Sequence, residues 1–116
     1  MKNFILGLLA SFTVISCAQA DVEINEDVKI FDVRTTSEWQ TGHLESATHL
    51  SMELLPTNIE LLVPDKSQQV VLYCRSGNRA GQMMSVMQKL GYTNVINVGS
   101  VRDASKLLKD NVIVGK

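Results

Sequence analysis

The architecture of this chain follows from one segment, Tyr73-Cys74-Arg75-Ser76-Gly77-Asn78-Arg79-Ala80-Gly81. The apolar run at residues 70–73 predicts a buried strand that ends at the cysteine. Apolar side chains then recur at helical spacing from Ala80 to Leu90, and Gly91 ends the pattern. We therefore expect a buried strand, a tight loop and the N-terminus of a helix in direct succession.

The loop after Cys74 favours negative charge at its centre. Backbone N–H groups of a tight loop and of a helix N-terminus point inward, and together they form a ring of donors. A sulfur at the edge of that ring is stabilised as the thiolate, which is the reactive form of cysteine. We predict that Cys74 is the catalytic nucleophile. We predict substrate-binding roles for the residues that follow it, Arg75, Ser76, Gly77, Asn78 and Arg79.

A buried structural cysteine at the end of a core strand is the alternative interpretation, since free cysteine is among the most buried residue types. A purely structural cysteine requires neither Arg75 nor Arg79 close behind it in the sequence. It also does not require the turn at Ser76-Gly77-Asn78. The composition of the loop therefore favours the functional interpretation.

The length of the loop separates two kinds of chemistry. Cysteine-dependent phosphatases and some arsenate reductases also combine a cysteine, a loop of amides and an arginine, but their arginine lies one position later than Arg79 does here. A loop shorter by one residue forms a smaller cradle, which suits a single extra sulfur atom better than a tetrahedral oxyanion. On these residues the chain resembles a single-domain rhodanese, a thiosulfate sulfurtransferase. It is most similar to the small periplasmic rhodaneses of the phage-shock type.

The resemblance covers residues 28–110 and is not confined to the cysteine loop. Phe31-Asp32-Val33-Arg34, Glu38-Trp39 and Gly42-His43-Leu44 are similar to the first rhodanese signature. The segment from Leu90 to Gly99 resembles the one that leads into the closing helix of the family. The sequence departs from the family pattern away from the cysteine loop, at Ser46-Ala47, Ser100 and Asp103.

The resemblance implies an α/β fold of the rhodanese-like type, with three layers in which a central, mostly parallel sheet has helices on both faces. It implies transfer of sulfane sulfur from a small-molecule donor such as thiosulfate, through a persulfide on Cys74, to a thiophilic acceptor such as cyanide or a thiol. The alternatives are a persulfide carrier or a binding module that relays sulfur to a protein partner, and a phosphatase-like or arsenate-reducing enzyme.

The rest of the sequence predicts alternating strands and helices, which is the order of a parallel sheet covered on both faces. We expect strands at 28–33, 47–50, 70–73 and 94–98, and an extended tail at 111–116. We expect helices at 37–41 with Thr35 or Thr36 as its cap, at 54–55 and 59–63 on either side of Pro56, at 80–90 and at 101–108.

Asp32, Arg34 and Cys74 all lie at the carboxyl ends of strands in this prediction. Ligands bind such sheets beyond the carboxyl ends of the strands, so these residues are expected to meet at the site. We predict supporting roles there for Asp32 and Arg34. A simple ion pair between the two is an equal alternative.

The first 20 residues have the pattern of a secretory signal peptide. Lys2 supplies a positive charge, Phe4 to Ile15 is uncharged and apolar, and Ala18-Gln19-Ala20 is a small-residue cleavage site. The apolar stretch is shorter than the about 20 residues that a bilayer-spanning helix needs. The pattern therefore predicts export rather than a membrane-spanning helix.

Two processing routes follow from this N-terminus. Cleavage after Ala20 gives a periplasmic mature chain, residues 21–116, that forms a single rhodanese domain with Cys74 as its one thiol. The alternative is a lipoprotein, because Cys17 ends a lipoprotein-like sequence and two acyl chains on it would hold the domain at a membrane. We favour the first route, because Ala18 and Ala20 lie at the expected distance from the apolar stretch.

Composition excludes several classes of partner. The chain has a formal net charge of −1 and no run of basic residues, so we expect no binding to nucleic acid. No cluster of His, Cys, Asp and Glu has the spacing of metal ligands, so we expect no metal, and we expect no cofactor. We expect no transmembrane span in the mature chain. We also expect a monomer whose partners are a small-molecule sulfur donor and a thiophilic acceptor.

Overall fold

The structure, a computed structural model, describes residues 23–115. The predicted signal peptide, its cleavage site at Ala20 and Cys17 lie outside these residues. The first half of the described chain contains β1 (Lys29–Asp32), α2 (Thr36–Thr41), β2 (His43–Leu44), β3 (Thr48–His49) and α3 (Leu55–Leu62). The second half contains β4 (Val70–Cys74), α4 (Asn78–Lys89), β5 (Val95–Ser100), α5 (Val101–Leu108) and β6 (Val112–Ile113).

Four strands form a parallel sheet in the order β3-β1-β4-β5. β4 lies in the interior of this sheet, and all five of its residues are buried. An interior strand of a parallel sheet is covered on both faces, which explains the uninterrupted apolar sequence before Cys74. β2 and β6 form a separate antiparallel pair, in which His43 lies opposite Ile113.

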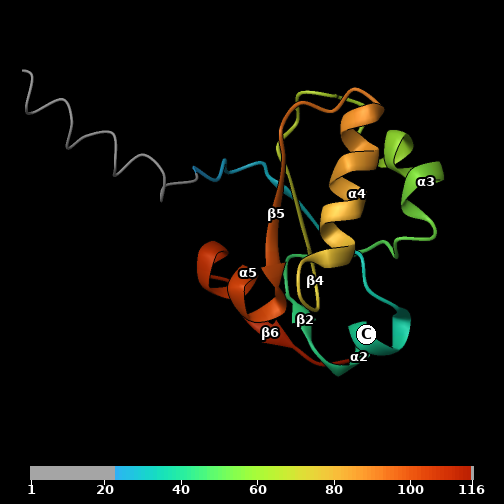
Figure 1. The fold of residues 1–116 in the computed structure, drawn as a ribbon. Helices are drawn as coiled ribbons and strands as arrows, with labels where there is room; N and C mark the ends of the chain where they lie inside the picture. Colours follow the sequence, from blue (N-terminus) through green and yellow to red (C-terminus); the bar gives the residue numbers. More distant parts are fainter. Residues whose placement is uncertain (1–22, 116) are drawn as a thin grey trace, which may run out of the picture.

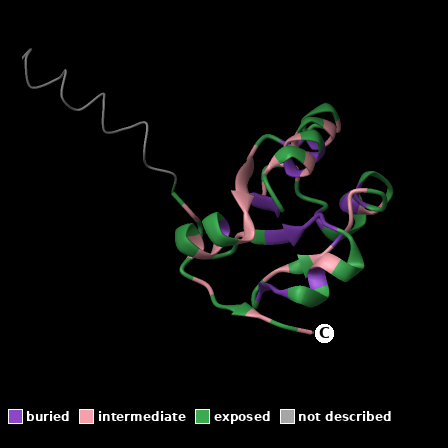
Figure 2. Ribbon diagram, turned by 60° about the horizontal axis from the view of Figure 1, so that its bottom comes forward, coloured by how far each residue is buried: buried purple, intermediate pink, exposed green. Residues whose placement is uncertain are grey.

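Helices cover both faces of the sheet, with α3 and α4 to the right of β4 and β5 in Figure 1 and α5 to the left. Successive side chains of β4 point to opposite faces. Leu72 and Cys74 belong to the apolar cluster that includes α3 and α4. Val71 and Tyr73 belong to the cluster that includes α5. Figure 2 shows the buried strand among helices with exposed outer faces, and the three-layer α/β fold implied by the resemblance is confirmed.

The two helical pieces predicted around Pro56 form one helix in the structure. α3 runs from Leu55 to Leu62, and Pro56 lies in its first turn. Proline is tolerated there, because an N–H in the first turn has no partner within the helix and the φ of proline is already helical. The predicted break is therefore wrong, and the continuous helix places Leu55 and Ile59 in the core.

The tail after residue 111, which was predicted to be extended but without a partner, packs beside α2. Its residues in β6 pair with β2, a two-residue strand that the sequence did not indicate. The Nε2 of His43 lies 2.8 Å from the Gly115 carbonyl oxygen, and the Gly115 N–H donates to the Gln40 carbonyl at 3.1 Å. These contacts hold the C-terminal segment against the edge of the molecule where α2 lies (Figure 1).

The helices are short, and two of their N-termini were predicted closely. Thr35 caps α2 as expected, since its hydroxyl accepts the Glu38 N–H at 3.3 Å. α4 begins at Asn78, slightly before the predicted start at Ala80, and is the longest described helix with 12 residues.

Within residues 23–115, no helix is both long enough and apolar enough to cross a membrane.

Candidate active site

The carboxyl ends of three neighbouring strands bring the predicted site residues to one edge of the sheet. β1 ends at Asp32, β4 at Cys74 and β5 at Ser100. Asp32 pairs with Tyr73, and Cys74 pairs with Ser100, so these strand ends lie side by side. The loop at 75–77 leaves β4 at this edge and leads directly into α4. Ligands bind parallel α/β sheets at this edge.

Cys74 lies at the base of the loop and is 1% exposed. The Gly77 N–H donates a hydrogen bond to the Cys74 Sγ at 2.9 Å. Burial raises the pKa of the Cys74 thiol, but backbone N–H groups together lower it by more, so this pKa lies below the usual value of a cysteine. These donors belong to Ala80, Ser76, Gly77 and Arg79. The ring of amides is therefore directed at the sulfur, and it stabilises the thiolate.

Gly77 occupies a position that only glycine fits. Its φ is +97°, a backbone conformation in which an L side chain is strained. A Cβ at this position would also lie 3.2 Å from the Cα of Gly99 in β5. The absence of a side chain thus lets the loop turn its N–H toward Cys74 while it packs against the neighbouring strand.

Asn97, in β5, ties that strand to the cysteine loop. Its Nδ2 donates to the Gly77 carbonyl at 2.9 Å, and its Oδ1 accepts the Gly99 N–H at 2.9 Å. The Gly77 carbonyl also accepts the Gly81 N–H at 2.9 Å, so one carbonyl group links the first turn of α4 to the end of β5. The sequence pattern did not single out Asn97, although an amide side chain within an otherwise apolar strand is a signal of such a role.

Arg79, in the first turn of α4 directly after the loop, is bound to α2. Its Nη1 and Nη2 donate to the two carboxylate oxygens of Glu38 at 2.7 and 2.9 Å. Glu38 also accepts the Thr35 N–H at 3.1 Å in the capping box that begins α2. The hydrogen bonds from Arg79 lower the pKa of Glu38 to about 2. Arg79 therefore joins the loop to α2, and its predicted contact with a substrate stays a prediction.

Replacing Glu38 by glutamine is expected to destabilise the protein by about 1 kcal/mol near pH 7, the scale of a partly exposed ion pair with good geometry. Glutamine preserves the capping box, so the change isolates the charge. The pKa of Glu38 is about 2 in the folded chain and 4.5 ordinarily. The stabilisation is therefore complete above pH 4.5 and is lost as the pH falls through about 2.

Urea unfolding of the wild type and of Glu38→Gln, near pH 7 and near pH 3, measures this contribution. The difference in unfolding free energy between the two proteins is expected to narrow at the lower pH. An equal difference at both pH values would show that the charge of Glu38 contributes no stability.

Asp32 and Arg34 form a buried ion pair. The Nε and Nη2 of Arg34 donate to the Asp32 carboxylate at distances between 2.7 and 3.0 Å. The Arg34 Nη2 also donates to the Gly42 carbonyl at 2.6 Å. Asp32 is fully buried and Arg34 is 6% exposed. The ion pair that was the alternative for these residues is present, and a direct role of either residue on a substrate stays a prediction.

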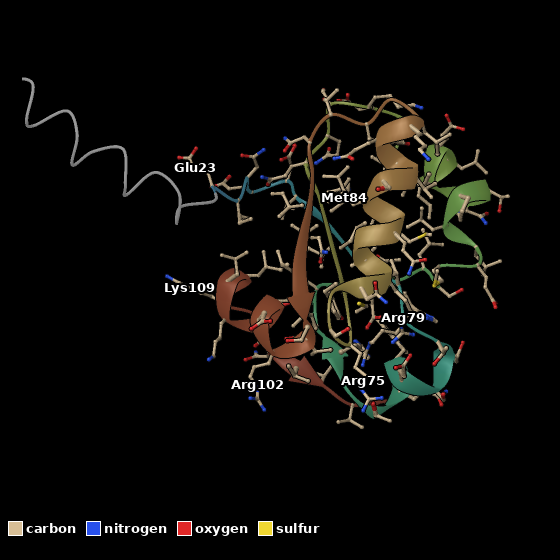
Figure 3. All side chains as sticks on the ribbon, viewed as in Figure 1. Glu23, Arg75, Arg79, Met84, Arg102 and Lys109 are labelled. Carbon is tan, nitrogen blue, oxygen red and sulfur yellow. The ribbon has the colours of Figure 1, made fainter. Side chains whose placement is uncertain are left out.

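Three hollows surround the cysteine loop, with volumes between about 380 and 430 Å³. Arg34 lines all three, Arg79 lines one and Arg75 lines the other two. In Figure 3 the labelled side chains of Arg75, Arg79 and Arg102 lie at the same edge of the molecule. A concave edge that is rich in arginine attracts small anionic substrates.

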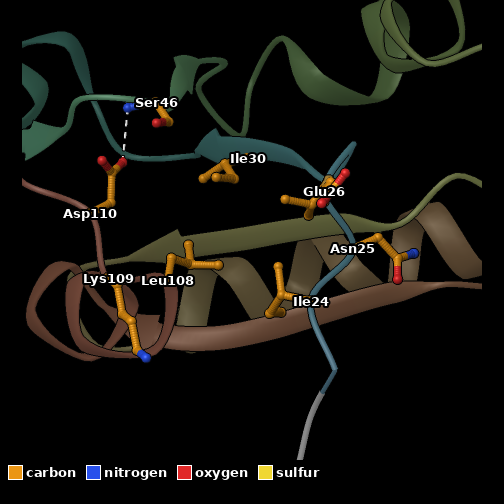
Figure 4. A pocket seen from close by; sticks show the side chains of 9 residues that line it. Ile24, Asn25, Glu26, Ile30, Ser46, Leu108, Lys109 and Asp110 are labelled. Atoms are coloured by element: carbon orange, nitrogen blue, oxygen red, sulfur yellow. Dashed lines mark hydrogen bonds between the residues drawn. The ribbon is translucent and has the colours of Figure 1, made fainter.

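A further hollow of about 360 Å³ lies at the opposite end of β1 (Figure 4). Ile24, Ile30 and Leu108 line it, together with Lys109 and Asp110. No cysteine, histidine or arginine lines this hollow, so it is separate from the cysteine loop and its arginines. Within the described part of the chain, no group of three or more His, Cys, Asp and Glu residues is placed to hold a metal ion.

Residues 16–102 match the protein family described as Rhodanese-like domain. A thiosulfate sulfurtransferase from Escherichia coli, PspE, is 33% identical over 72 residues, which cover 62% of this chain and 69% of that protein. A sulfurtransferase from Allochromatium vinosum is 37% identical over 73 residues, which cover 63% of this chain and 66% of that protein. The second match spans just under two thirds of the relative's own length.

Other relatives contain a similar segment within a longer protein. A tRNA uridine(34) hydroxylase from Erwinia tasmaniensis is 26% identical over 89 residues, which cover 72% of this chain and 25% of that protein. Proteins that share this domain therefore differ in activity.

A solved structure described as a rhodanese with anions, from E. coli, has a similar fold. It superposes with a TM-score of 0.69 and 28% sequence identity. The similar region covers 76% of this chain and 99% of that chain. The predicted three-layer architecture is thereby confirmed by comparison as well as by the strand order.

Proposed function

Because this chain belongs to the rhodanese-like domain family, which includes sulfurtransferases, we propose that it is a thiosulfate sulfurtransferase that holds the transferred sulfur on Cys74. One observation supports the proposal above all. The Cys74 Sγ accepts the Gly77 N–H at 2.9 Å inside a ring of amides that outweighs the effect of burial and lowers the pKa of the thiol. A thiolate in such a ring is a nucleophile, and the same donors suit the negative outer sulfur of a persulfide.

In the first half-reaction the Cys74 thiolate attacks the outer sulfur of thiosulfate. A bond forms between the Cys74 Sγ and that sulfur, the sulfur–sulfur bond of the donor breaks, and its electron pair leaves with sulfite. The product is a Cys74 persulfide whose outer sulfur is negatively charged. Because the nucleophile is already deprotonated, this step needs no general base.

In the second half-reaction a thiophilic acceptor attacks the outer sulfur of the persulfide. When the acceptor is cyanide, the product is thiocyanate. The electron pair of the broken sulfur–sulfur bond returns to the Cys74 Sγ, which becomes a thiolate again.

We assign recruitment of the anionic donor to Arg75, which is exposed beside Cys74. We assign to Arg79 the positioning of the loop through its ion pair with Glu38. Ser76, Gly77 and Asn78 supply the backbone of the cradle.

Turnover of thiosulfate with cyanide tests this function. The purified mature chain is expected to form thiocyanate and sulfite in equal amounts and to leave aryl phosphates intact. Hydrolysis of aryl phosphates without formation of thiocyanate would overturn the proposal in favour of oxyanion chemistry. A stable persulfide that no small acceptor removes would overturn it in favour of a carrier that serves a protein partner.

Replacing Arg75 by alanine is expected to raise the KM for thiosulfate about fivefold at low salt, the scale of one exposed contact between opposite charges. The rise is expected to shrink as salt increases, because screening already weakens the attraction in the wild type. Lys89→Ala, which removes an exposed positive charge at the far end of α4, is the matched control. An unchanged KM in Arg75→Ala at low salt would remove Arg75 from the donor site.

We also propose that residues 1–20 are removed on export and that residues 21–116 form one monomeric, periplasmic rhodanese domain. The pattern of charge, apolar stretch and small residues at the N-terminus supports this. The intact mass of the protein from a periplasmic fraction is expected to correspond to a chain that begins at Asp21. A membrane-bound product with acyl chains, which becomes soluble in Cys17→Ala, would show that the lipoprotein route operates instead.

A further inference from the structure

Two arginines at this edge of the sheet, Arg75 and Arg102, have no acidic partner among residues 23–115. Arg34 and Arg79 each bind a carboxylate, so their charges are compensated within the protein. Arg75 and Arg102 are exposed, and neither makes an ion pair with another residue of 23–115. The positive charge available to a ligand at this edge of the sheet is therefore that of Arg75 and Arg102.

Arg75 and Arg102 line the same hollow, which has a volume of about 380 Å³. Arg75 directly follows Cys74 in the sequence. Ser100, which also lines the hollow, is the residue that pairs with Cys74 across β4 and β5. The hollow is therefore lined by neighbours of Cys74 in the sequence and across β4 and β5, and Figure 3 shows both labelled arginines at this edge.

The segment that contains Arg102 is fixed relative to the cysteine loop. The Asp103 N–H donates to the Ser100 hydroxyl at 3.1 Å, and the Ser100 N–H donates to the Asp103 carboxylate at 3.4 Å. Asn97 ties the same strand to the carbonyl of Gly77. The carboxylate of Asp103 also lines the hollow, but it is engaged in this capping box.

We propose that Arg75 and Arg102 bind the carboxylate of the sulfur acceptor, and that the acceptor is a small thiol with a carboxylate group. The proposal rests on the sulfurtransferase function proposed above. Planar guanidinium groups bind carboxylates through paired, charge-assisted hydrogen bonds. A hollow of about 380 Å³ lies within the size range of small-molecule sites.

A thiol held in this way reaches the persulfide from the β5 side. Its thiolate attacks the outer sulfur, the bond between the two persulfide sulfurs breaks, and the electron pair returns to the Cys74 Sγ. The proton of the thiol goes to water, and the product is the persulfide of the small thiol. The two guanidinium groups also reduce the repulsion between the incoming anion and the negative persulfide.

Arg102→Gln tests the inference with two acceptors of similar size, 3-mercaptopropionate and 2-mercaptoethanol. The KM for 3-mercaptopropionate is expected to rise about fivefold, the scale of one exposed contact between opposite charges. The KM for 2-mercaptoethanol is expected to rise much less, because it has a hydroxyl in place of the carboxylate. Lys109→Gln, at the other end of α5, removes the same charge and is expected to change neither value. An equal rise for both thiols, or no rise for either, would overturn the inference.

A second measurement does not depend on sulfur transfer. Alkylation of Cys74 by iodoacetate and by iodoacetamide compares an anionic with a neutral reagent of the same size. The preference of the wild type for iodoacetate is expected to fall about fivefold in Arg102→Gln, the scale of one exposed contact between opposite charges, and to persist in Lys109→Gln. If thiosulfate leaves Cys74 unmodified but this preference falls as expected, the proposed function fails and the carboxylate site stands. If the persulfide forms but the preference is the same in all three proteins, only the carboxylate site fails.

Discussion

Cys74→Ser is expected to abolish sulfur transfer while the protein still folds. Serine has nearly the size of cysteine, so the packing beneath the loop is preserved. Its hydroxyl is not ionised at neutral pH, and it cannot form the persulfide on which both half-reactions depend. Removal of a covalent nucleophile costs at least about a thousandfold in turnover. Thiosulfate:cyanide turnover is the measurement, and circular dichroism with thermal unfolding shows whether the fold is preserved.

Asp32→Asn is a control that separates loss of stability from loss of the nucleophile. Asp32→Asn weakens the buried ion pair with Arg34 but leaves the thiolate in place, so it is expected to lower stability more than Cys74→Ser does. Substantial turnover in folded Cys74→Ser would contradict the proposed mechanism, because no second thiol exists among residues 23–115 to replace Cys74.

Gly77→Ala is expected to raise the pKa of the Cys74 thiol and to lower turnover on the order of 100-fold. The φ of +97° is strained for alanine, and the added Cβ would lie 3.2 Å from the Cα of Gly99. Both effects push the loop away from β5 and displace the Gly77 N–H that donates to the sulfur. Alkylation of the thiol as a function of pH measures the change, because the rate follows the fraction of thiolate.

Gly91→Ala is the matched control for this variant. Gly91 also has a positive φ, +103°, but a Cβ there would meet only the flexible side chain of Lys66 at 3.9 Å. Both variants are expected to lose about 1 kcal/mol or more of stability from backbone strain. Only Gly77→Ala is expected to raise the thiol pKa. An unchanged thiol pKa in Gly77→Ala would show that the Gly77 amide does not stabilise the thiolate.

The parts of the fold that depend on local sequence were predictable. Residues 70–73 are apolar without interruption because β4 is buried on both faces, and the periodicity after Ala80 reflects one face of α4 packed on the sheet. The break predicted at Pro56 failed because proline in a first turn has the same sequence signature as proline between helices. The pairing of β6 with β2 has no local signal, because each strand has two residues and only tertiary contact selects its partner.

The candidate site also has a part that local sequence predicts and a part that it does not. Cys74 and the loop were recognisable because their chemistry lies within one short segment whose backbone forms the cradle. The partners that hold the loop lie far from it in the sequence. Glu38 is 41 positions from Arg79, and Asn97 is 20 positions from Gly77. A capping pattern at Thr35 accounts for Glu38 within α2 but does not reveal an ion pair across the molecule. Such contacts depend on how strand ends meet, which the pattern of a single sequence does not specify.

Formation of a persulfide on Cys74 tests the central claim most directly. The intact mass of the mature protein, recorded after incubation with thiosulfate and removal of the excess, is expected to increase by one sulfur atom, with one sulfite released per chain. Peptide mapping is expected to place that sulfur on Cys74, and cyanide is expected to remove it as thiocyanate. A protein that releases no sulfite and keeps its original mass, or that binds the sulfur at a residue other than Cys74, would contradict the account.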